Sequence, residues 1–200
     1  MRVRKYFDSM HALLNDHQGY ITAAQVTAAG IPRRYLSEML ASGEICKVTR
    51  GLYALPAIWE DEMYSLQYRF AKGVFSHGTA LYLHAMTDRT PHRYTMTFPH
   101  GYNTSGAKKQ GLVVKTATSE RFGLGITEVS SPCGKLVKVY DIERTLCDIV
   151  RGRHIDDVQL VNQAMKTYAV SGTKDIPKLM LYAERLCVKP KVLRYMEVLL

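Results

Sequence analysis

The fold of this chain is decided by residues 21–55, which read ITAAQVTAAGIPRRYLSEMLASGEICKVTRGLYAL. Thr22 can cap a short helix over residues 23–29, because its hydroxyl can accept a free backbone N–H of the first turn. Gly30 ends that helix, since glycine adopts the left-handed conformation of such a turn without a steric penalty. Pro32 suits the first turn of a second helix, where a missing amide N–H costs nothing. This half of the stretch therefore predicts two helices joined by a tight turn.

The second helix is amphipathic and is followed by a hairpin. Apolar residues recur at helical spacing on one face, whereas the opposite face is polar and is basic at its N-terminal end. The apolar set is Leu36, Met39 and Leu40, and the polar set is Arg33, Arg34, Ser37 and Glu38. Gly43 ends the helix, and β-type residues follow over 44–55, interrupted by Arg50 and Gly51. A helix, a tight turn, a basic-tipped helix and a basic hairpin together predict a winged helix-turn-helix.

This motif places particular side chains on DNA. The N-terminal part of its second helix enters the major groove, and the hairpin, or wing, lies along the backbone. Two arginines stand at that end of the helix, and a guanidinium can bond guanine O6 and N7 together. Polar and basic side chains of the wing suit phosphates or the minor groove. The candidate DNA-binding residues are Arg33, Arg34, Tyr35, Ser37, Lys47, Thr49 and Arg50. The alternative is a winged helix that docks onto protein, with its arginines only solvated.

Composition and charge are consistent with a nucleic-acid partner. The chain has 200 residues, enough for one large domain or two small ones, and 46% of them are hydrophobic, which argues against disorder. Its formal charge is +9, which favours a polyanionic partner. Residues 1–56 carry a net charge of +3 and the remainder +6, so the second part could also lie along DNA or face an acidic protein.

The four cysteines and the hydropathy pattern bear on location. Cys46, Cys133, Cys147 and Cys187 are far apart and include no C-x-x-C pair, so we expect buried thiols in a reducing cytoplasm. Neither a signal peptide nor an apolar run of about 18 residues is present, and we therefore expect no membrane partner.

The rest of the sequence predicts an α+β protein of two domains. An apolar helix over about residues 3–14 would complete the three-helix core of a DNA-binding domain at 1–56, and residues 57–60 form the expected junction to a C-terminal domain at 57–200. Strands followed by a run of helices predict a mixed α/β architecture for that domain, ending in several helices. Its expected strands are 74–76, 93–98, 112–116, 125–130 and 135–140; its expected helices are 61–71, 79–86, 141–151, 156–170, 175–187 and 190–200. The glycine-bounded segment 101–111 is expected to be a mobile loop.

Two polar clusters of the second domain invite a chemical interpretation. Ser76 beside His77 suggests a nucleophile and its base, but neighbouring residues rarely face each other, and Ser76 is better explained as a helix N-cap. Asp141, Glu143 and Asp148 could form a nuclease-like metal cluster. A structural role for them is favoured, in which Asp141 caps a helix and Asp148 pairs with a residue one turn earlier. The seven histidines lack metal-ligand spacing, and no phosphate-binding glycine motif occurs, so no metal or cofactor is expected.

Several segments resemble the AbiE-type abortive-infection antitoxins (AbiEi). They are GYITAAQVTAAGIPRRYL at 19–36, LASGEICKVTRGLYALP at 40–56, VFSHGTALYLHAMTDRTP at 74–91, TFPHG at 97–101 and VYDIERTLCDIVR at 139–151. Any helix-turn-helix repressor could show the first two, whereas SHGTALYLHAMTD within 74–91 and YDIERTLCD within 139–151 are more specific, and their order and spacing fit the family.

The resemblance implies a non-enzymatic, cytoplasmic transcriptional repressor and antitoxin of a type IV toxin–antitoxin system in phage defence. Such a protein binds double-stranded DNA at inverted repeats of its own promoter. Through its C-terminal domain it also counters a nucleotidyltransferase-like toxin without forming a stable complex. The candidate antitoxin-domain residues are Ser76, His77, Thr79, Asp141, Glu143, Arg144 and Asp148. A DNA-targeting nuclease or a solitary transcriptional regulator with the same N-terminal domain are the alternatives.

Overall fold

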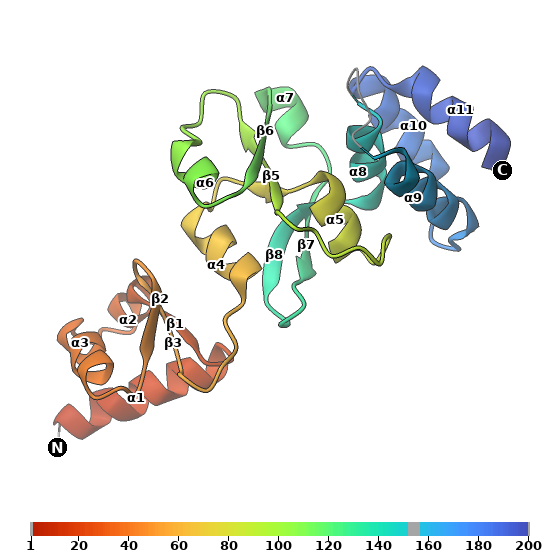
Figure 1. Ribbon diagram of the computed structural model, residues 1–200. Coiled ribbons are helices and arrows are strands. Elements are labelled where there is room, and N and C mark those ends of the chain that lie inside the picture. Colours follow the sequence, from red (N-terminus) through yellow and green to blue (C-terminus); the bar gives the residue numbers. More distant parts are fainter. Residues whose placement is uncertain (1, 152–156, 200) are drawn as a thin grey trace. The chain divides into compact units, whose positions relative to one another are not determined.

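The computed structural model describes residues 2–151 and 157–199. Its contacts divide the chain into two compact units, Met1–Arg69 and Phe70–Leu200. Figure 1 labels most of the helices and strands of both units, numbered in chain order. Together the units combine helices with an antiparallel sheet and a mixed sheet, so the predicted α+β class is confirmed. Among the described residues, no helix is long and apolar enough to cross a membrane.

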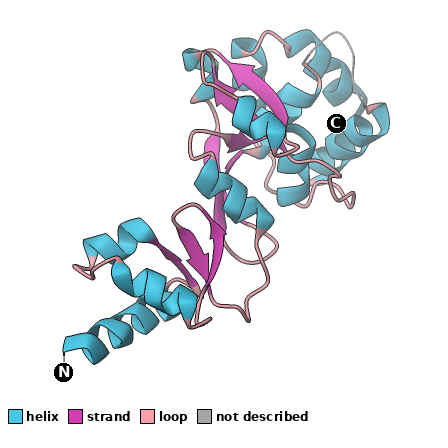
Figure 2. Cartoon of the chain, turned by 60° about the vertical axis from the view of Figure 1, so that its left-hand side comes forward, coloured by secondary structure: helices cyan, strands magenta, loops and turns pink. Residues whose placement is uncertain are grey.

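The N-terminal unit is a winged helix-turn-helix, as predicted. Three short strands pair antiparallel in the order β1-β3-β2 and appear in magenta beside the helices in Figure 2. Its elements are α1 (Arg2–Asp16), β1 (Tyr20–Thr22), α2 (Ala23–Ala28), α3 (Arg34–Ala41), β2 (Cys46–Thr49), β3 (Leu52–Ala54) and α4 (Glu62–Arg69). The predicted hairpin is β2 and β3, whereas β1 was not predicted, because a three-residue strand leaves too short a pattern to recognise.

The predicted start and end of α2 are confirmed at atomic detail. Thr22 Oγ1 accepts the N–H of Gln25 at 3.1 Å, and the Gln25 side chain reaches back to the Thr22 N–H at 2.7 Å, which completes a capping box. Gly30 has a φ of +69°, the left-handed turn that glycine permits. Helix α3 then begins at Arg34 with Arg33 as its N-cap, so Pro32 precedes the helix instead of lying in its first turn.

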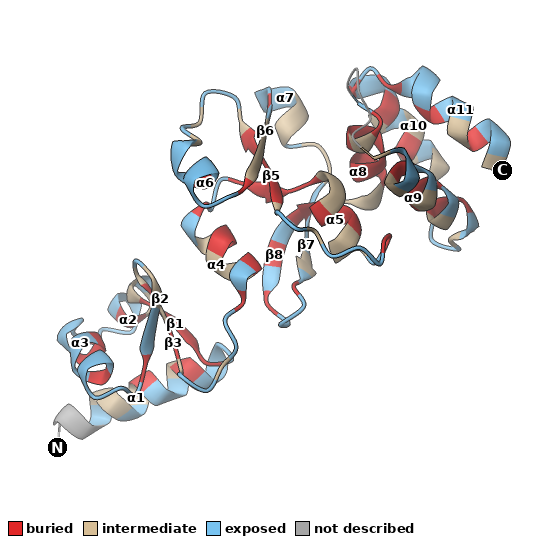
Figure 3. Cartoon of the chain, in the orientation of Figure 1, coloured by how far each residue is buried: buried red, intermediate tan, exposed pale blue. Residues whose placement is uncertain are grey.

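The core of this unit corrects one assignment on α3. Tyr35, Leu36 and Met39 are the buried residues of the helix, while Leu40 is 39% exposed. Figure 3 shows buried and exposed residues on α3. Tyr35 is buried where the sequence predicted Leu40 to be, because the Tyr35 ring packs against the rings of Tyr6 and Phe7 on α1. The core cluster consists of Met10, Leu14, Ile21, Val26, Ile31, Tyr35, Leu36, Met39 and Ile45.

Helix α4 belongs to the N-terminal unit by its contacts, whereas the sequence placed the domain boundary after Pro56. The ring of Tyr20 packs edge-on against Tyr64, with 5.3 Å between ring centroids. The Tyr20 hydroxyl also accepts the N–H of Asp61 at 2.8 Å. These contacts join β1 to α4 across about forty residues of sequence, a separation that leaves no local pattern.

The C-terminal unit contains a five-stranded mixed sheet in the order β6-β5-β4-β8-β7. Strands β4 and β8 are parallel, as are β5 and β6, and the other neighbours are antiparallel. The strands are β4 (Val74–Phe75), β5 (Thr95–Pro99), β6 (Val113–Ala117), β7 (Ile126–Ser130) and β8 (Leu136–Tyr140). The helices are α5 (His77–Leu83), α6 (Ser105–Lys109), α7 (Ser119–Phe122), α8 (Ile142–Ile149), α9 (Val158–Val170), α10 (Ile176–Arg185) and α11 (Lys189–Leu199).

The main differences in this unit from the sequence prediction are short helices. Segment 101–111 was expected to be a mobile loop but contains α6, which is held by the fully buried Ala107. Helix α7 was not predicted either, since its four residues are too few to show periodicity. The expected helices at 156–170 and 190–200 are α9 and α11, and residues 156 and 200 themselves lie outside the described residues.

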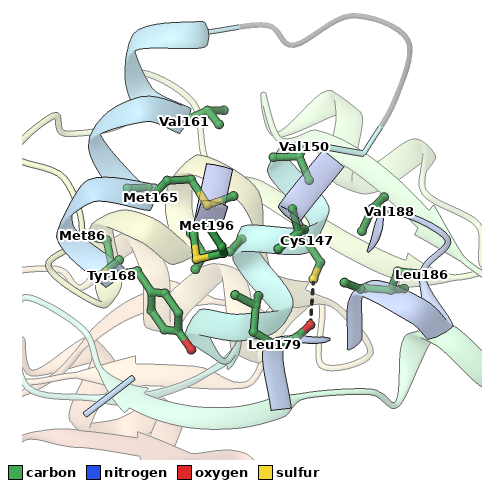
Figure 4. Close-up of a cluster of buried hydrophobic side chains, with 14 of the residues drawn as sticks. Met86, Cys147, Val150, Val161, Met165, Tyr168, Leu179, Leu186, Val188 and Met196 are labelled. Carbon is green, nitrogen blue, oxygen red and sulfur yellow. Dashed lines mark hydrogen bonds between the residues drawn. The ribbon is translucent and has the colours of Figure 1, made fainter. Parts of the chain in front are cut away.

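Helices α8 to α11 enclose a hydrophobic cluster, part of which is drawn in Figure 4. Cys147 of α8 is completely buried in it, and its thiol lies 3.9 Å from the carbonyl oxygen of Leu179 on α10. Burial raises the pKa of the Cys147 thiol to about 12. The expectation of buried thiols is correct for this cysteine alone, because Cys46, Cys133 and Cys187 are exposed.

Candidate nucleic-acid interface

The N-terminal end of α3 presents two exposed arginines to solvent. The Arg33 guanidinium donates from Nε to Thr27 Oγ1 of α2 at 2.9 Å, which fixes its stem against the preceding helix. The Arg34 guanidinium donates to the hydroxyl of Tyr35 at 2.9 Å, and this hydrogen bond raises the pKa of Arg34. Both side chains are therefore partly oriented before any ligand binds. Ser37 is exposed one turn further along α3.

Tyr35 does not face solvent, although the sequence grouped it with the DNA-binding residues. Its side chain is 1% exposed, and its ring lies 5.0 Å from that of Tyr6 and 5.5 Å from that of Phe7. The guanidinium carbon of Arg34 lies 4.9 Å from the Tyr35 ring centroid. Tyr35 is thus a core residue that positions Arg34 through a hydrogen bond and a cation–π contact.

The wing carries the second group of basic residues. Lys47 and Arg50 are exposed, and Thr49 is half-buried. At the tip, Gly51 has a φ of +82°, and its carbonyl oxygen accepts the N–H of Ala23 at 2.9 Å and the hydroxyl of Tyr68 at 3.0 Å. The tip is therefore fixed to the start of α2 and to α4.

Sequence reasoning missed Tyr68 as a supporting residue of the wing. Tyr68 lies on α4, beyond the predicted domain boundary, and 17 residues separate it from Gly51. A pocket of about 460 Å³ lies beside this contact and is lined by Thr49, Arg50, Tyr68 and Arg69. Two arginines thus line a cavity next to the wing.

The Ser76 cluster of the second unit has a different arrangement from the one expected. Ser76 occupies the N-cap position of α5, but its side chain makes no capping hydrogen bond. Its hydroxyl instead accepts from Thr97 Oγ1 at 2.8 Å and lies 3.1 Å from His77 Nδ1. The expectation that the two neighbours would not face each other is wrong, because His77 has a φ of +53°, which turns its ring back. Ser76 is completely buried, and with Thr79, whose hydroxyl accepts the Thr95 N–H at 2.8 Å, it ties α5 to β5.

Asp141 and Glu143 belong to a polar network that joins α8 to α9 and α10. Asp141 caps α8 by accepting the N–H of Arg144 at 2.9 Å, as expected. Lys178 of α10 forms ion pairs with both carboxylates, at 3.0 Å each, and Tyr168 of α9 donates to Glu143 at 3.1 Å. Burial disfavours the charged form of Lys178, but the hydrogen bonds that its ammonium donates to Glu143 and Asp141 outweigh burial and raise the pKa of Lys178. Nothing in the sequence links Lys178 to these acids.

Arg144 and Asp148 form the expected pair one helical turn apart, at 2.9 Å, but both are buried. Arg144 Nη1 also donates to the carbonyl oxygens of Arg121 and Leu124. Its guanidinium carbon lies 4.3 Å from the ring centroid of Tyr140, and burial raises the pKa of that phenol. The pair therefore holds α8 to the segment before β7.

The two polar sequence clusters meet in space, since His77, Arg144 and Asp148 line one pocket. Asp141 and Glu143 lie instead at the Lys178 network. Within residues 2–151 and 157–199, no group of three or more His, Cys, Asp or Glu residues is placed to hold a metal ion.

These features define a winged helix-turn-helix protein with basic side chains on both the α3 end and the wing. Residues 10–56 match the family model described as "Transcriptional regulator, AbiEi antitoxin", and this match confirms the predicted resemblance to AbiE-type antitoxins. No curated protein matches the sequence. Among solved structures, the chain is similar to the crystal structure of the RV2827C protein from Mycobacterium tuberculosis. The two share 12% identity and a TM-score of 0.49, over 94% of this chain and 78% of that one.

Proposed function

We propose that the protein is a DNA-binding antitoxin that represses its own operon at inverted repeats of the promoter. The observation that carries the proposal is the pair of exposed basic surfaces on one winged helix-turn-helix: Arg33 and Arg34 on α3, and Lys47 and Arg50 on the wing. The match of residues 10–56 to the AbiEi transcriptional regulators supports the same function.

Each surface has its own part in binding. Arg33 and Arg34 would enter the major groove, where a bidentate contact to guanine contributes about 1–3 kcal/mol of discrimination. Lys47 and Arg50 would contact phosphates, which adds affinity for any DNA sequence. Ser37 and Thr49 would complete the two contact sets through their hydroxyls.

The direct test is a salt titration of binding to the promoter upstream of the gene. Neutralising Lys47 or Arg50 should weaken binding to promoter and random DNA alike, and each lost phosphate contact should make the negative slope of log K against log salt shallower by about 0.9. A loss confined to the promoter sequence, with an unchanged slope, would assign the wing to base recognition.

We further propose that the C-terminal unit counters a nucleotidyltransferase-like toxin in a type IV phage-defence system, without a stable complex, in the cytoplasm. The resemblance of segments 74–91 and 139–151 supports this part. The test is growth rescue of cells that express the toxin, using fragments divided where the contacts divide, 1–69 and 70–200. Rescue by a folded 70–200 fragment that fails to repress a promoter fusion is expected. Rescue by 1–69 would place the antitoxin function in the winged helix.

A further inference from the structure

The C-terminal unit contains a polar pocket of about 410 Å³ that the proposed DNA contacts do not use. Its volume lies in the range of small-molecule sites, about 300–1,000 Å³. Four elements surround it: β5 and β6 of the sheet, the start of α5, and α8 together with Arg151, which follows α8. The side chains that matter for its chemistry are His77, Thr97, Lys115, Arg144, Asp148 and Arg151.

The sheet topology explains why a pocket is open here. Strand β6 lies at one edge of the sheet, and its Lys115 is the register partner of Thr97 on β5. Side chains of paired residues in adjacent strands project from the same face of the sheet. Lys115 and Thr97 therefore share one face. Helix α8 contributes Arg144 and Asp148, which lie one turn apart, and Arg151 follows just after the end of α8.

Two cations remain available to a ligand after the internal contacts are assigned. Arg144 and Asp148 neutralise each other, and the Arg144 donors are further occupied by two backbone carbonyls. Among the contacts of the described residues, none involves the Lys115 ammonium or the Arg151 guanidinium. Lys115 is half-buried in the pocket and Arg151 is exposed at it, so the pocket has a surplus of positive charge.

We propose that this pocket binds a free nucleotide through its phosphates, with Lys115 and Arg151 as the phosphate-binding residues. A lysine ammonium and an arginine guanidinium are the side chains that bind phosphate oxygens best, the latter in bidentate fashion. Two cations at the pocket, with His77 and the Thr116 hydroxyl also lining it, suit a ligand with two or more phosphates. The pocket volume of about 410 Å³ favours a small molecule over a nucleic-acid strand, which needs an extended groove. This ligand goes beyond the proposed function and does not depend on it.

Isothermal titration of the full-length protein with ATP, GTP and pyrophosphate tests the proposal. At least one nucleotide should bind once per chain, and pyrophosphate should compete with it, because the cations recognise the phosphates. Lys115→Ala and Arg151→Ala should each raise the Kd at least tenfold. Lys166→Ala, which removes an exposed charge of α9 outside the pocket, should change it less than twofold. Far-UV circular dichroism establishes that each variant is folded.

Three results would overturn the proposal. The first is that wild type binds none of the three probes at millimolar concentration. The second is that Lys166→Ala weakens binding as much as the pocket variants, which marks unspecific attraction to a basic protein. The third is that a single-stranded oligonucleotide binds through Lys115 and Arg151 while the nucleotides do not. Loss of promoter binding would leave this inference unaffected, so its failure is distinguishable from failure of the repressor function.

Discussion

Arg144→Met should destabilise the C-terminal unit strongly. The side chain of Arg144 is 1% exposed and that of its partner Asp148 is 5% exposed, so the substitution leaves a buried carboxylate without a cation. The carbonyl oxygens of Arg121 and Leu124 also lose their donor. Removing one partner of a buried ion pair costs about 3–5 kcal/mol. We expect a loss of this size in the free energy of unfolding, measured by urea denaturation followed by circular dichroism.

A double variant and a surface control make this expectation refutable. Arg144→Met with Asp148→Leu removes both charges, and apolar replacement of a buried pair is often close to neutral, so the double variant should be more stable than Arg144→Met alone. Lys166→Met, an exposed change on α9, should stay within about 0.5 kcal/mol of wild type. If Arg144→Met also stays within about 0.5 kcal/mol of wild type, or if the double variant is less stable than Arg144→Met, the Arg144–Asp148 pair does not stabilise the packing of α8 against the segment before β7.

Three further results are expected. Cys46, Cys133 and Cys187 should react with a thiol reagent in the native protein, whereas Cys147 should react only on unfolding, and four fast-reacting thiols would contradict the burial of Cys147. Because the pKa of Cys147 is raised to about 12 in the folded state, the free energy of unfolding should fall as the pH rises above the unfolded-state pKa of about 8.5, and it should fall less in Cys147→Ala. Tyr68→Phe should lower the free energy of unfolding by about 0.5–1.5 kcal/mol, because the Gly51 carbonyl loses a donor, and should weaken binding to any DNA; unchanged DNA binding would show that this contact does not position the wing. The purified protein should not cut DNA with Mg²⁺ or Mn²⁺, since Asp141, Glu143 and Asp148 are engaged by a helix cap, by Lys178 and by Arg144; cleavage that Asp141→Ala abolishes would assign a nuclease.

The helix-turn-helix could be predicted from the sequence because its signals are local. Thr22 and Gln25 cap α2 from three residues apart, and Gly30 sets the turn by its own φ of +69°. The same holds for the Asp141 cap and the Arg144–Asp148 pair, which lie within one or two turns of a single helix. At the candidate DNA interface, the sequence therefore predicted the location of the basic residues, on the N-terminal end of α3 and on the wing.

The remaining features depend on contacts between distant segments. Tyr35 and Leu40 both satisfy a helical apolar face, and only the rings of α1 decide that Tyr35 is the buried one. The same limit applies to α4, which joins the N-terminal unit through Tyr64 and Tyr68, and to the ion pairs of Lys178 with two acids of α8. The Ser76–His77 contact was missed for another reason, a positive φ at a histidine, which sequence patterns do not reveal.

A gel-shift titration at fixed salt shows whether the N-terminal end of α3 reads promoter DNA. Wild type should be compared with Arg33→Ala/Arg34→Ala and with Lys166→Ala/Arg185→Ala, which removes the same charge from exposed positions of the second unit. Each α3 substitution should cost about 1–3 kcal/mol of promoter affinity. The control pair should bind nearly as wild type does. If Arg33→Ala/Arg34→Ala binds the promoter as tightly as wild type, α3 is not the recognition helix.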